Sequence, residues 1–369
     1  MKKKIIVIHG FFNNGPLGLM NTAKSTYSAL KDKYSVIKNN ISYPVLIKFN
    51  KIMLCSDLER LNDEDNFIHI FILQPHHSRI LINKILLKNK KKNNYFIGYW
   101  PWELSKWPEI WCDDLKLVDE LWCLSKFIYD SIPKLHFKTN KFVMNPGFRI
   151  KKNIKNNSSP KKYKFLFSFD PRSKFKRKNP EGTTMAFWNA FGFPFDMKKN
   201  YFHKDVSLTI KLINAPKFKN GLEEIMQLIN KDKRINLIKE KLTYENLINL
   251  YKNHDCYISL HKSEGFGNAI AENLILGNEV ITTNYSGVKD FCSEENSFLI
   301  DFYLENVIKN YPHSSINSLW ASPNIKQASR VMLNLKNNRI LKNINGPTVD
   351  LSIKGFSRRI TERIEKIII

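Results

Sequence analysis

The stretch Ser259–Asp290, SLHKSEGFGNAIAENLILGNEVITTNYSGVKD, decides the fold that we expect of the whole chain. An apolar run at its left edge, Cys256–His261, has the length and composition of a buried strand. The turn Lys262–Gly267 follows, and its two glycines let backbone amides approach a ligand closely. The sequence therefore predicts a strand that ends in a glycine turn.

A helix and a second strand follow this turn. Asn268 is expected to be the N-cap, Ala269–Leu276 consists of good helix formers, and Gly277 is expected to end the helix. Val280–Thr283 is the next predicted strand, and Ser286–Gly287 opens another loop. This order is a βαβ unit, whose turn lies where α/β sheets usually bind ligands.

Two acidic residues flank the start of the predicted helix. Glu264 lies in the turn and Glu272 in the helix, with seven residues between them. A helix N-terminus suits a phosphate, whereas a carboxylate accepts hydrogen bonds from vicinal hydroxyls. The pattern therefore predicts a ligand with hydroxyls at both ends and phosphate in the middle, as in a nucleotide-sugar. Two solvated surface glutamates are the plain alternative.

The segment Glu264–Glu272, EGFGNAIAE, resembles the E-x7-E signature of retaining GT-B glycosyltransferases of the glycosyltransferase family 4 type. The segment Gly277–Gly287 resembles the G-x-P-V-I-x-x-x-x-x-G segment of the same family, with Glu279 where proline is usual. The resemblance implies that Glu264 contacts the donor sugar and Glu272 the ribose. The donor-binding residues that it implies between these acids are Gly265, Phe266, Gly267 and Asn268.

A basic loop, Asp170–Gly182, resembles the loop that delivers an arginine and a lysine to the diphosphate in this family. The matching R-K-N-P motif favours Lys178, with Arg177 and Arg172 competing for the arginine role. A departing nucleoside diphosphate gains negative charge in the transition state, so fixed cations stabilise it. A merely solvated basic loop is the alternative.

The tryptophan-rich stretch Tyr95–Phe127 resembles a pattern found in a bacterial subgroup of these transferases. It predicts a helix from Trp107 to Val118 and makes Glu103 a third catalytic candidate, beside Glu264 and Lys178. Glu103 either positions the acceptor hydroxyl or the donor sugar, or anchors the tryptophan indole N–H groups. His76 and His77 follow the carboxyl end of an earlier strand, where contacts to acceptor or donor are expected, but we favour a polar loop.

The N-terminus is expected to open a Rossmann-like domain with a strand, the glycine-rich turn Gly10–Gly18 and a helix over Ala23–Tyr34. The resemblance implies that Gly15 and Gly18 face the donor phosphates. Glycines at such turns are also common for steric reasons, and both interpretations stay open.

A chain of 369 residues is too long for one ordinary core and fits two domains. The resemblance implies an α/β chain with the GT-B fold, in which two Rossmann-like domains face each other across a cleft. The second domain is expected to include a helix over Leu242–Tyr251 with Thr243 as N-cap. The expected parts are an acceptor domain (1–150), a linker (151–162), a nucleotide-sugar-binding domain (163–342) and a C-terminal helix that crosses back to the first domain (343–369).

The net charge of +25 fits nucleic acid, an anionic membrane or an acidic acceptor as partners. Lys, Asn and Ile are abundant throughout, so we favour compositional bias, with peripheral attraction to an anionic membrane as a by-product. Nucleic acid is the weakest interpretation, because no basic motif interleaved with aromatic residues is present.

The cysteines and the hydropathy of the sequence indicate in which cellular compartment the protein is expected. The five cysteines are odd in number and show no C-x-x-C spacing, so we expect reduced core residues. No apolar run reaches membrane-spanning length, and Met1–His9 is too short for a signal peptide. We therefore expect a cytoplasmic protein, with peripheral contact at the inner face of the membrane left open.

The resemblance implies a retaining hexosyltransferase that moves a sugar from a nucleotide diphosphate-sugar to a hydroxyl of a glycan or glycolipid acceptor. Cell-envelope polysaccharide or lipopolysaccharide synthesis is the expected setting. We expect no metal and no cofactor, since the sequence lacks a convincing D-x-D motif and contains cationic side chains that can bind the diphosphate in place of a metal ion. The alternatives are a degenerate GT-B protein that binds sugar or nucleotide without turnover, and an epimerase or phosphorylase of the same fold.

Overall fold

The chain forms two compact units in the computed structural model. Unit 1 consists of Met1–Arg149, Val307–Ser318 and Asp350–Ile369, and unit 2 of Ile150–Asn306 and Leu319–Val349. Each unit contains a six-stranded parallel sheet, which confirms the predicted α/β fold class. The residues that the structure describes are 4–43, 45–46, 52–55, 66–88, 94–134, 139–152, 162–171, 175–193, 203–213, 223, 226–227, 229, 232–308, 311–315, 317–338 and 346–368.

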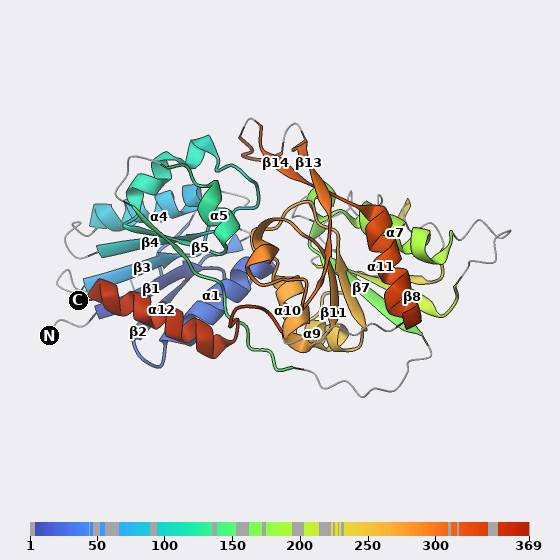
Figure 1. The fold of residues 1–369 in the computed structure, drawn as a ribbon. Coiled ribbons are helices and arrows are strands. Elements are labelled where there is room, and N and C mark those ends of the chain that lie inside the picture. Colours follow the sequence, from blue (N-terminus) through green and yellow to red (C-terminus); the bar gives the residue numbers. More distant parts are fainter. Residues whose placement is uncertain are drawn as a thin grey trace. The chain divides into compact units, whose positions relative to one another are not determined.

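The sheet of unit 1 has the strand order β2-β1-β3-β4-β5-β6 (Figure 1). The central strands carry apolar residues with little or no exposed surface, as expected where helices cover both faces of a parallel sheet. The strands are β1 (Lys4–Gly10), β2 (Ser35–Asn40), β3 (Asn66–Phe71), β4 (Asn94–Trp100), β5 (Glu120–Cys123) and β6 (Asn140–Val143). The helices are α1 (Leu17–Leu30), α4 (Pro75–Lys88), α5 (Lys126–Ser131) and α12 (Ile353–Ile368), with the 3-10 helices η2 (Glu109–Trp111) and η3 (Asp113–Leu117).

The C-terminal helix α12 belongs to unit 1, where it packs against α1 (Figure 1). Its Arg363 donates hydrogen bonds to both carboxylate oxygens of Glu120, and the Nε–Oε2 distance is 3.0 Å. Tyr95 and Trp122 also donate to this carboxylate, at 2.9 and 3.0 Å. Glu120 has no exposed surface, so α12 supplies the cation that a buried acid in β5 needs.

A chain of hydrogen-bonded polar side chains crosses four neighbouring strands of this sheet. Asn39 Nδ2 lies 2.9 Å from His9 Nδ1, His9 Nε2 lies 3.0 Å from His69 Nδ1, and His69 Nε2 lies 2.9 Å from Asn94 Oδ1. Because an amide NH2 donates and an amide oxygen accepts, both imidazoles carry their proton on Nε2. Burial lowers the pKa of His69 to about 4 and that of His9 well below its usual value. Both rings are therefore neutral at pH 7.

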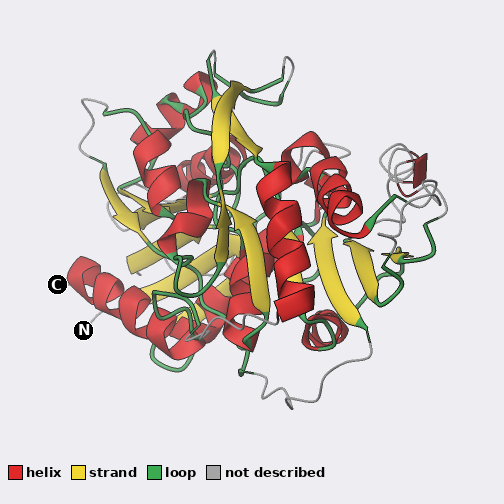
Figure 2. Cartoon of the chain, turned by 45° about the vertical axis from the view of Figure 1, so that its right-hand side comes forward, coloured by secondary structure: helices red, strands yellow, loops and turns green. Residues whose placement is uncertain are grey.

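The sheet of unit 2 has the order β12-β11-β10-β7-β8-β9. Figure 2 shows its strands in yellow, with helices alongside. The strands are β7 (Tyr163–Phe169), β8 (Val206–Leu212), β9 (Ile235–Ile238), β10 (Cys256–Ser259), β11 (Glu279–Thr283) and β12 (Phe298–Ile300), and an antiparallel pair is formed by β13 (Phe302–Asn306) and β14 (Leu319–Pro323). The helices are α6 (Phe175–Lys178), α7 (Pro180–Phe191), α9 (Tyr244–Lys252), α10 (Asn268–Leu276), α11 (Ile325–Asn338) and the 3-10 helix η6 (Ser286–Asp290).

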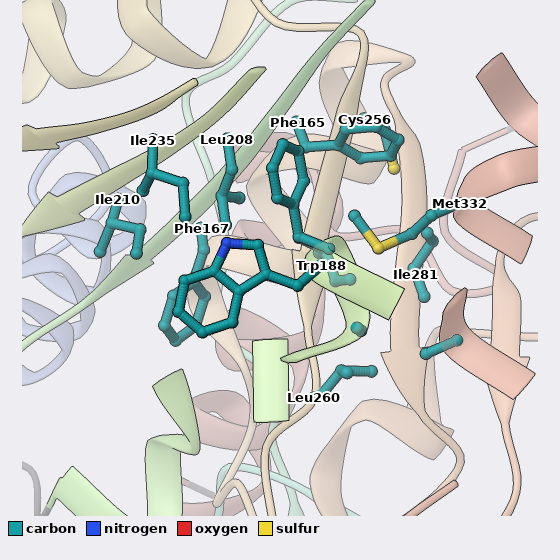
Figure 3. Close-up of a cluster of buried hydrophobic side chains, with 14 of the residues drawn as sticks. Phe165, Phe167, Trp188, Leu208, Ile210, Ile235, Cys256, Leu260, Ile281 and Met332 are labelled. Carbon is teal, nitrogen blue, oxygen red and sulfur yellow. The ribbon is translucent and has the colours of Figure 1, made fainter. Parts of the chain in front are cut away.

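The core of unit 2 lies between its sheet and the helices α7 and α11 (Figure 3). Phe165 and Phe167 from β7, Trp188 from α7 and Met332 from α11 lie in this cluster. The strands β7, β8 and β10 contribute long apolar side chains with almost no exposed surface. This close packing fixes the positions of the carboxyl ends of these strands.

The βαβ unit around α10 forms as predicted, with one correction at the helix start. Gly267, at φ 100°, precedes the helix, and Asn268 is its first residue and makes no side-chain cap. A Cβ at Gly267 would come within 2.9 Å of Val288, so both the backbone angle and the packing require glycine. Gly277, at φ 81°, ends the helix as predicted, and Thr243 caps α9 as predicted.

Several expectations for unit 1 were wrong in detail. His76 and His77 lie in the first turn of α4 instead of in a loop, and the helix expected over Trp107–Val118 is replaced by the short 3-10 helices η2 and η3. The first helix begins at Leu17, so Gly18 lies within α1 and not in the preceding turn.

The segment Val307–Ser318 was expected in the second domain but belongs to unit 1. The Tyr311 hydroxyl donates to Glu103 at 3.1 Å, and Ser315 Oγ donates to the Trp107 carbonyl at 2.7 Å. The His313 and Trp111 rings lie 5.1 Å apart. Within the linker predicted over 151–162, residues 153–161 lie outside the described residues, as do 343–345 and 369 of the predicted C-terminal part.

Candidate functional site

The loop after β10 is tied to the loop before α7. The Lys262 amide donates to the Arg177 carbonyl at 2.8 Å, and Asn179 Nδ2 donates to the Leu260 carbonyl at 2.7 Å. Asn179 adopts a left-handed conformation, with φ 54°, and its Oδ1 caps α7 by accepting from the Gly182 amide. Pro180 then occupies the first turn of α7, where no N–H is needed. The R-K-N-P motif thus turns the chain sharply beside the Glu264 loop.

Glu264 lies between the two cations that this motif supplies. Lys178 Nζ is 2.5 Å from Glu264 Oε1, and Arg177 Nη1 is 3.2 Å from Oε2. Burial alone would raise the pKa of Glu264, but the charges of Lys178 and Arg177 outweigh it and lower the pKa to about 2. Arg177 also donates to the Ser263 carbonyl at 2.6 Å. Glu264 is therefore an anion at any ordinary pH, with a cation at each oxygen.

The main chain of the Glu264 turn is held by the Ser286–Gly287 loop. The Glu264 amide donates to Ser286 Oγ at 2.8 Å, and the Gly287 amide donates to the Glu264 carbonyl at 2.9 Å. A Cβ at Gly287 would come within 2.3 Å of the Gly265 carbonyl oxygen, so only glycine allows this approach. The sequence identified this loop but not its contact with Glu264.

The turn residues contribute their backbone more than their side chains. Phe266 is buried and packs on Phe291, with ring centroids 4.8 Å apart. The first backbone hydrogen bond of α10 runs from the Ala271 amide to the Gly267 carbonyl at 3.0 Å. The preceding amides at the start of this nine-residue helix therefore have no partner within it, and the positive end of the helix dipole lies there.

Glu272 differs in character from Glu264. It is 2% exposed, and its Oε1 accepts a hydrogen bond of 2.9 Å from the Tyr244 hydroxyl. Burial raises the pKa of Glu272 to about 8, although the bond from Tyr244 acts in the opposite direction. The sequence predicted two carboxylates that accept hydrogen bonds from hydroxyls, whereas the structure ion-pairs Glu264 and leaves Glu272 buried, with a pKa that favours the protonated form at pH 7.

Two further residues of this region were missed from the sequence. Tyr244 is the first residue of α9, and its contact with Glu272 follows from a helix start that Thr243 already indicated. His261 has no exposed surface, and within the described part of the chain neither ring nitrogen has a hydrogen-bond partner. Burial lowers the pKa of His261 to about 4, so its imidazole is neutral. A single histidine at the end of an apolar strand does not by itself predict a functional residue, so the sequence did not single out His261.

The glycines predicted in unit 1 fall into two environments. Gly15 is buried, and a Cβ there would lie 2.6 Å from the Phe11 ring, which favours a steric reason for this glycine. Gly18 is exposed on α1. Arg172, one of the two arginines considered for the diphosphate, lies outside the described residues.

Glu103 is half-buried and accepts a hydrogen bond from the Tyr311 hydroxyl. The indole N–H of Trp100 donates to Ser78 at 3.0 Å, and that of Trp102 donates to the Lys106 carbonyl at 2.7 Å. The idea that Glu103 anchors these neighbouring indoles is therefore wrong. The acid that does hold an indole in this region is Glu120.

The described residues include neither a metal-ligand cluster nor a membrane-spanning helix. Among them, no three His, Cys, Asp or Glu side chains form a group that could hold a metal ion. No described helix has both the length and the apolar character needed to cross a membrane. All five cysteines are free thiols.

A family model described as glycosyl transferases group 1 matches residues 205–311, which include Glu264 and Glu272. No curated protein matches the chain. The matched segment covers most of the strands and helices around the candidate site, and it supports a glycosyltransferase.

Solved structures share the architecture at low identity. A glycosyltransferase from Rickettsia africae ESF-5 has 14% identity and a TM-score of 0.63, with 100% of this chain and 99% of that chain covered. Anabaena HepE, solved with UDP and glucose, has 11% identity and a TM-score of 0.60, with 99% and 100% covered. The pneumococcal O-GlcNAc transferase GtfA, solved with UDP and GlcNAc, has 12% identity and a TM-score of 0.55, with 87% of this chain and 62% of GtfA covered. This chain thus spans 62% of the GtfA chain, and the likeness establishes the GT-B fold.

Proposed function

We propose that this protein is a retaining glycosyltransferase that moves a sugar from a nucleotide diphosphate-sugar to an acceptor hydroxyl. The observation that carries the proposal is the convergence of Arg177, Lys178 and Glu264 beside the start of α10. Cations and a helix N-terminus suit a diphosphate, and acidic side chains suit the hydroxyls of a sugar and a ribose. The match to group 1 glycosyl transferases over residues 205–311, which include Glu264 and α10, supports this chemistry.

Lys178 and Arg177 are the groups that would receive the diphosphate. In the free protein both are paired with Glu264, so an incoming diphosphate competes with that carboxylate for them. As the bond between the anomeric carbon and the phosphate oxygen breaks, the departing diphosphate gains charge that these cations stabilise. The acceptor oxygen forms the new bond on the same face of the sugar, and its proton leaves with the diphosphate.

The remaining roles complete the proposal. Glu264 contacts the donor sugar, Glu272 the ribose, and the amides of residues 265–268 the phosphates. Glu103 contacts the acceptor or the donor sugar. The reaction needs no metal, and the acceptor is a glycan or glycolipid of cell-envelope polysaccharide or lipopolysaccharide synthesis, reached by peripheral contact with the membrane.

The test is a donor screen followed by product analysis. Thermal shift with UDP-, GDP- and ADP-sugars identifies the donor, and we start with UDP-sugars because HepE and GtfA were solved with UDP and a sugar. Mass analysis then detects transfer or donor hydrolysis, and NMR of the product reports the anomeric configuration. We expect turnover to be lost in Glu264→Ala and kept in Glu295→Ala, because Glu295 is exposed on a nearby loop.

Tight donor binding without any product, in the presence of chelator or of divalent cations, would favour a GT-B protein that binds without turnover. Binding of none of the donors would remove the basis of the proposal. An inverted product would leave glycosyl transfer in place and overturn retention.

A further inference from the structure

Glu272 is a buried acid with a single polar contact. The residue is 2% exposed, and among the described residues its carboxyl group accepts one hydrogen bond, from the Tyr244 hydroxyl, and forms no ion pair. Glu264, eight positions earlier, has a cation at each oxygen. Of the two acids of the candidate site, Glu264 is therefore neutralised by cations, whereas Glu272 has only a neutral hydrogen-bond donor among the described residues.

The elements packed around α10 bring tyrosine side chains toward Glu272. Helix α9, strand β10 and strand β11 pack against α10, and Tyr251 and Tyr257 interact with Glu272 electrostatically. Both hydroxyls are engaged elsewhere, at Ser168. The titratable side chains of these three elements are Tyr244, Glu245, Tyr251, Lys252, Cys256, Tyr257 and Glu279.

Within the described part of the chain, none of the groups that interact with Glu272 offers a positive charge. Burial without a cation disfavours the ionised form, which explains why the pKa of Glu272 rises to about 8. The free protein therefore holds Glu272 as a carboxylic acid at pH 7, with Tyr244 donating to its Oε1.

We propose that a nucleotide-sugar bound at the start of α10 converts Glu272 into a carboxylate and releases its proton to solvent, with Tyr244 as the residue that positions this carboxyl. The inference rests on the proposed function, in which Glu272 receives the ribose. Two ribose hydroxyls that donate to the carboxylate keep their own protons, and hydrogen bonds to the charged form favour that form. The proton that leaves comes from the carboxylic acid alone, so one proton is released for each ligand bound.

Because binding releases a proton, the affinity for the nucleotide-sugar must increase as the pH rises. Below about pH 8 the ligand must displace a proton, so affinity rises with pH, by roughly tenfold per unit, and levels off above that value. The diphosphate of a nucleotide-sugar is a diester that does not titrate in this range. A pH dependence near neutrality therefore reports on the protein and not on the ligand.

The experiment is calorimetric titration of the full chain with UDP-glucose, UDP-N-acetylglucosamine and GDP-mannose, in buffers of different ionisation enthalpy, at about pH 6, 7 and 8. We expect close to one proton released per ligand at about pH 7. Glu272→Gln should bind more weakly, with neither proton release nor pH dependence. Because this substitution is nearly isosteric, it is expected to fold, and the wild-type titration tests the inference without it.

Tyr244→Phe tests the positioning role. It should weaken binding by about fivefold to tenfold while the released proton remains, because the acid stays buried. Tyr303→Phe, at a strongly exposed tyrosine of β13, is the matched control and should bind as the wild type does.

Binding with no buffer-dependent enthalpy and no pH dependence would overturn proton release and leave the proposed function intact. Wild-type affinity in Tyr244→Phe would overturn the positioning role. If none of the three nucleotide-sugars binds, the proposed function fails and this inference fails with it.

Discussion

Arg363, near the C-terminus, closes a bidentate ion pair with Glu120, whose side chain has no exposed surface. The two residues are 243 positions apart in sequence, yet both belong to unit 1. The guanidinium also lies 3.8 Å from the centre of the Phe142 ring, so it is fixed by stacking as well as by charge. This pair fastens the last helix to the edge region of the sheet.

Removing Arg363 should destabilise unit 1 strongly. Arg363→Ala leaves a buried carboxylate whose remaining donors among the described residues, Tyr95 and Trp122, are neutral, and we expect a loss of about 3 kcal/mol in the free energy of unfolding. Urea unfolding followed by circular dichroism measures it. Arg358→Ala, at an exposed position of the same helix, is the control and should change stability by less than about 0.5 kcal/mol. Equal effects of the two substitutions would contradict a special role for the Glu120 pair.

Neutralising Glu264 should have opposite effects on product binding and on turnover. In Glu264→Gln the cations Arg177 and Lys178 lose a competing carboxylate, so UDP should bind several-fold more tightly, by about 1 kcal/mol. Transfer should fall at least about a hundredfold, because the donor sugar loses its acidic partner. Calorimetry with UDP and a turnover assay measure the two effects, with Glu295→Gln as the control. Weaker UDP binding would show that Glu264 organises the cations instead of competing for them.

Glu272→Gln should stabilise the protein at neutral and alkaline pH. The folded pKa of about 8 lies above the ordinary 4.5, so the folded state binds the extra proton and stability falls as pH rises between these values. At pH 7 the penalty is roughly 3 kcal/mol, and a neutral amide avoids it. Thermal unfolding at about pH 5 and pH 8 should show the gain only at the higher pH. Glu245→Gln, an exposed neighbour of Tyr244, should show no such pH-dependent gain.

The histidine pair in the unit 1 sheet predicts acid sensitivity. His9 and His69 are neutral when folded and become charged on unfolding below their ordinary pKa of 6.5, so stability falls as pH drops from there toward about 4. His69, with a folded pKa of about 4, contributes up to roughly 3 kcal/mol across this window, and His9 acts in the same direction. Replacing both with phenylalanine should flatten urea midpoints measured between pH 6.5 and pH 4.5. A slope equal to that of the wild type would assign the acid sensitivity to other groups.

The parts of the fold that the sequence predicted are those with strong local signals. The glycine turn, the short helix to Gly277 and the next strand follow one another within thirty residues, and each has its own start or stop residue. The Thr243 cap was identified for the same reason, whereas the R-K-N-P loop was identified by its resemblance to the family. Long apolar strands between helices then define the α/β class.

The parts that were missed depend on contacts between distant segments. Nothing near Glu272 in sequence reveals that Tyr244 will be its partner, or that the Glu264 carboxylate will be occupied by Lys178. The burial that separates the pKa values of the two acids is likewise set by tertiary packing. The tryptophans around Trp107 suggested a helix, but tertiary packing formed two short 3-10 turns instead.

Unit 1 is assembled from three separate pieces of the chain, and unit 2 from two. Unit 2 ends at Val349 and α12 begins at Ile353, so a ribosome synthesises all of unit 2 before it completes unit 1. Until α12 emerges, Glu120 stays without its cation, so this ion pair of unit 1 forms only after unit 2 has been synthesised.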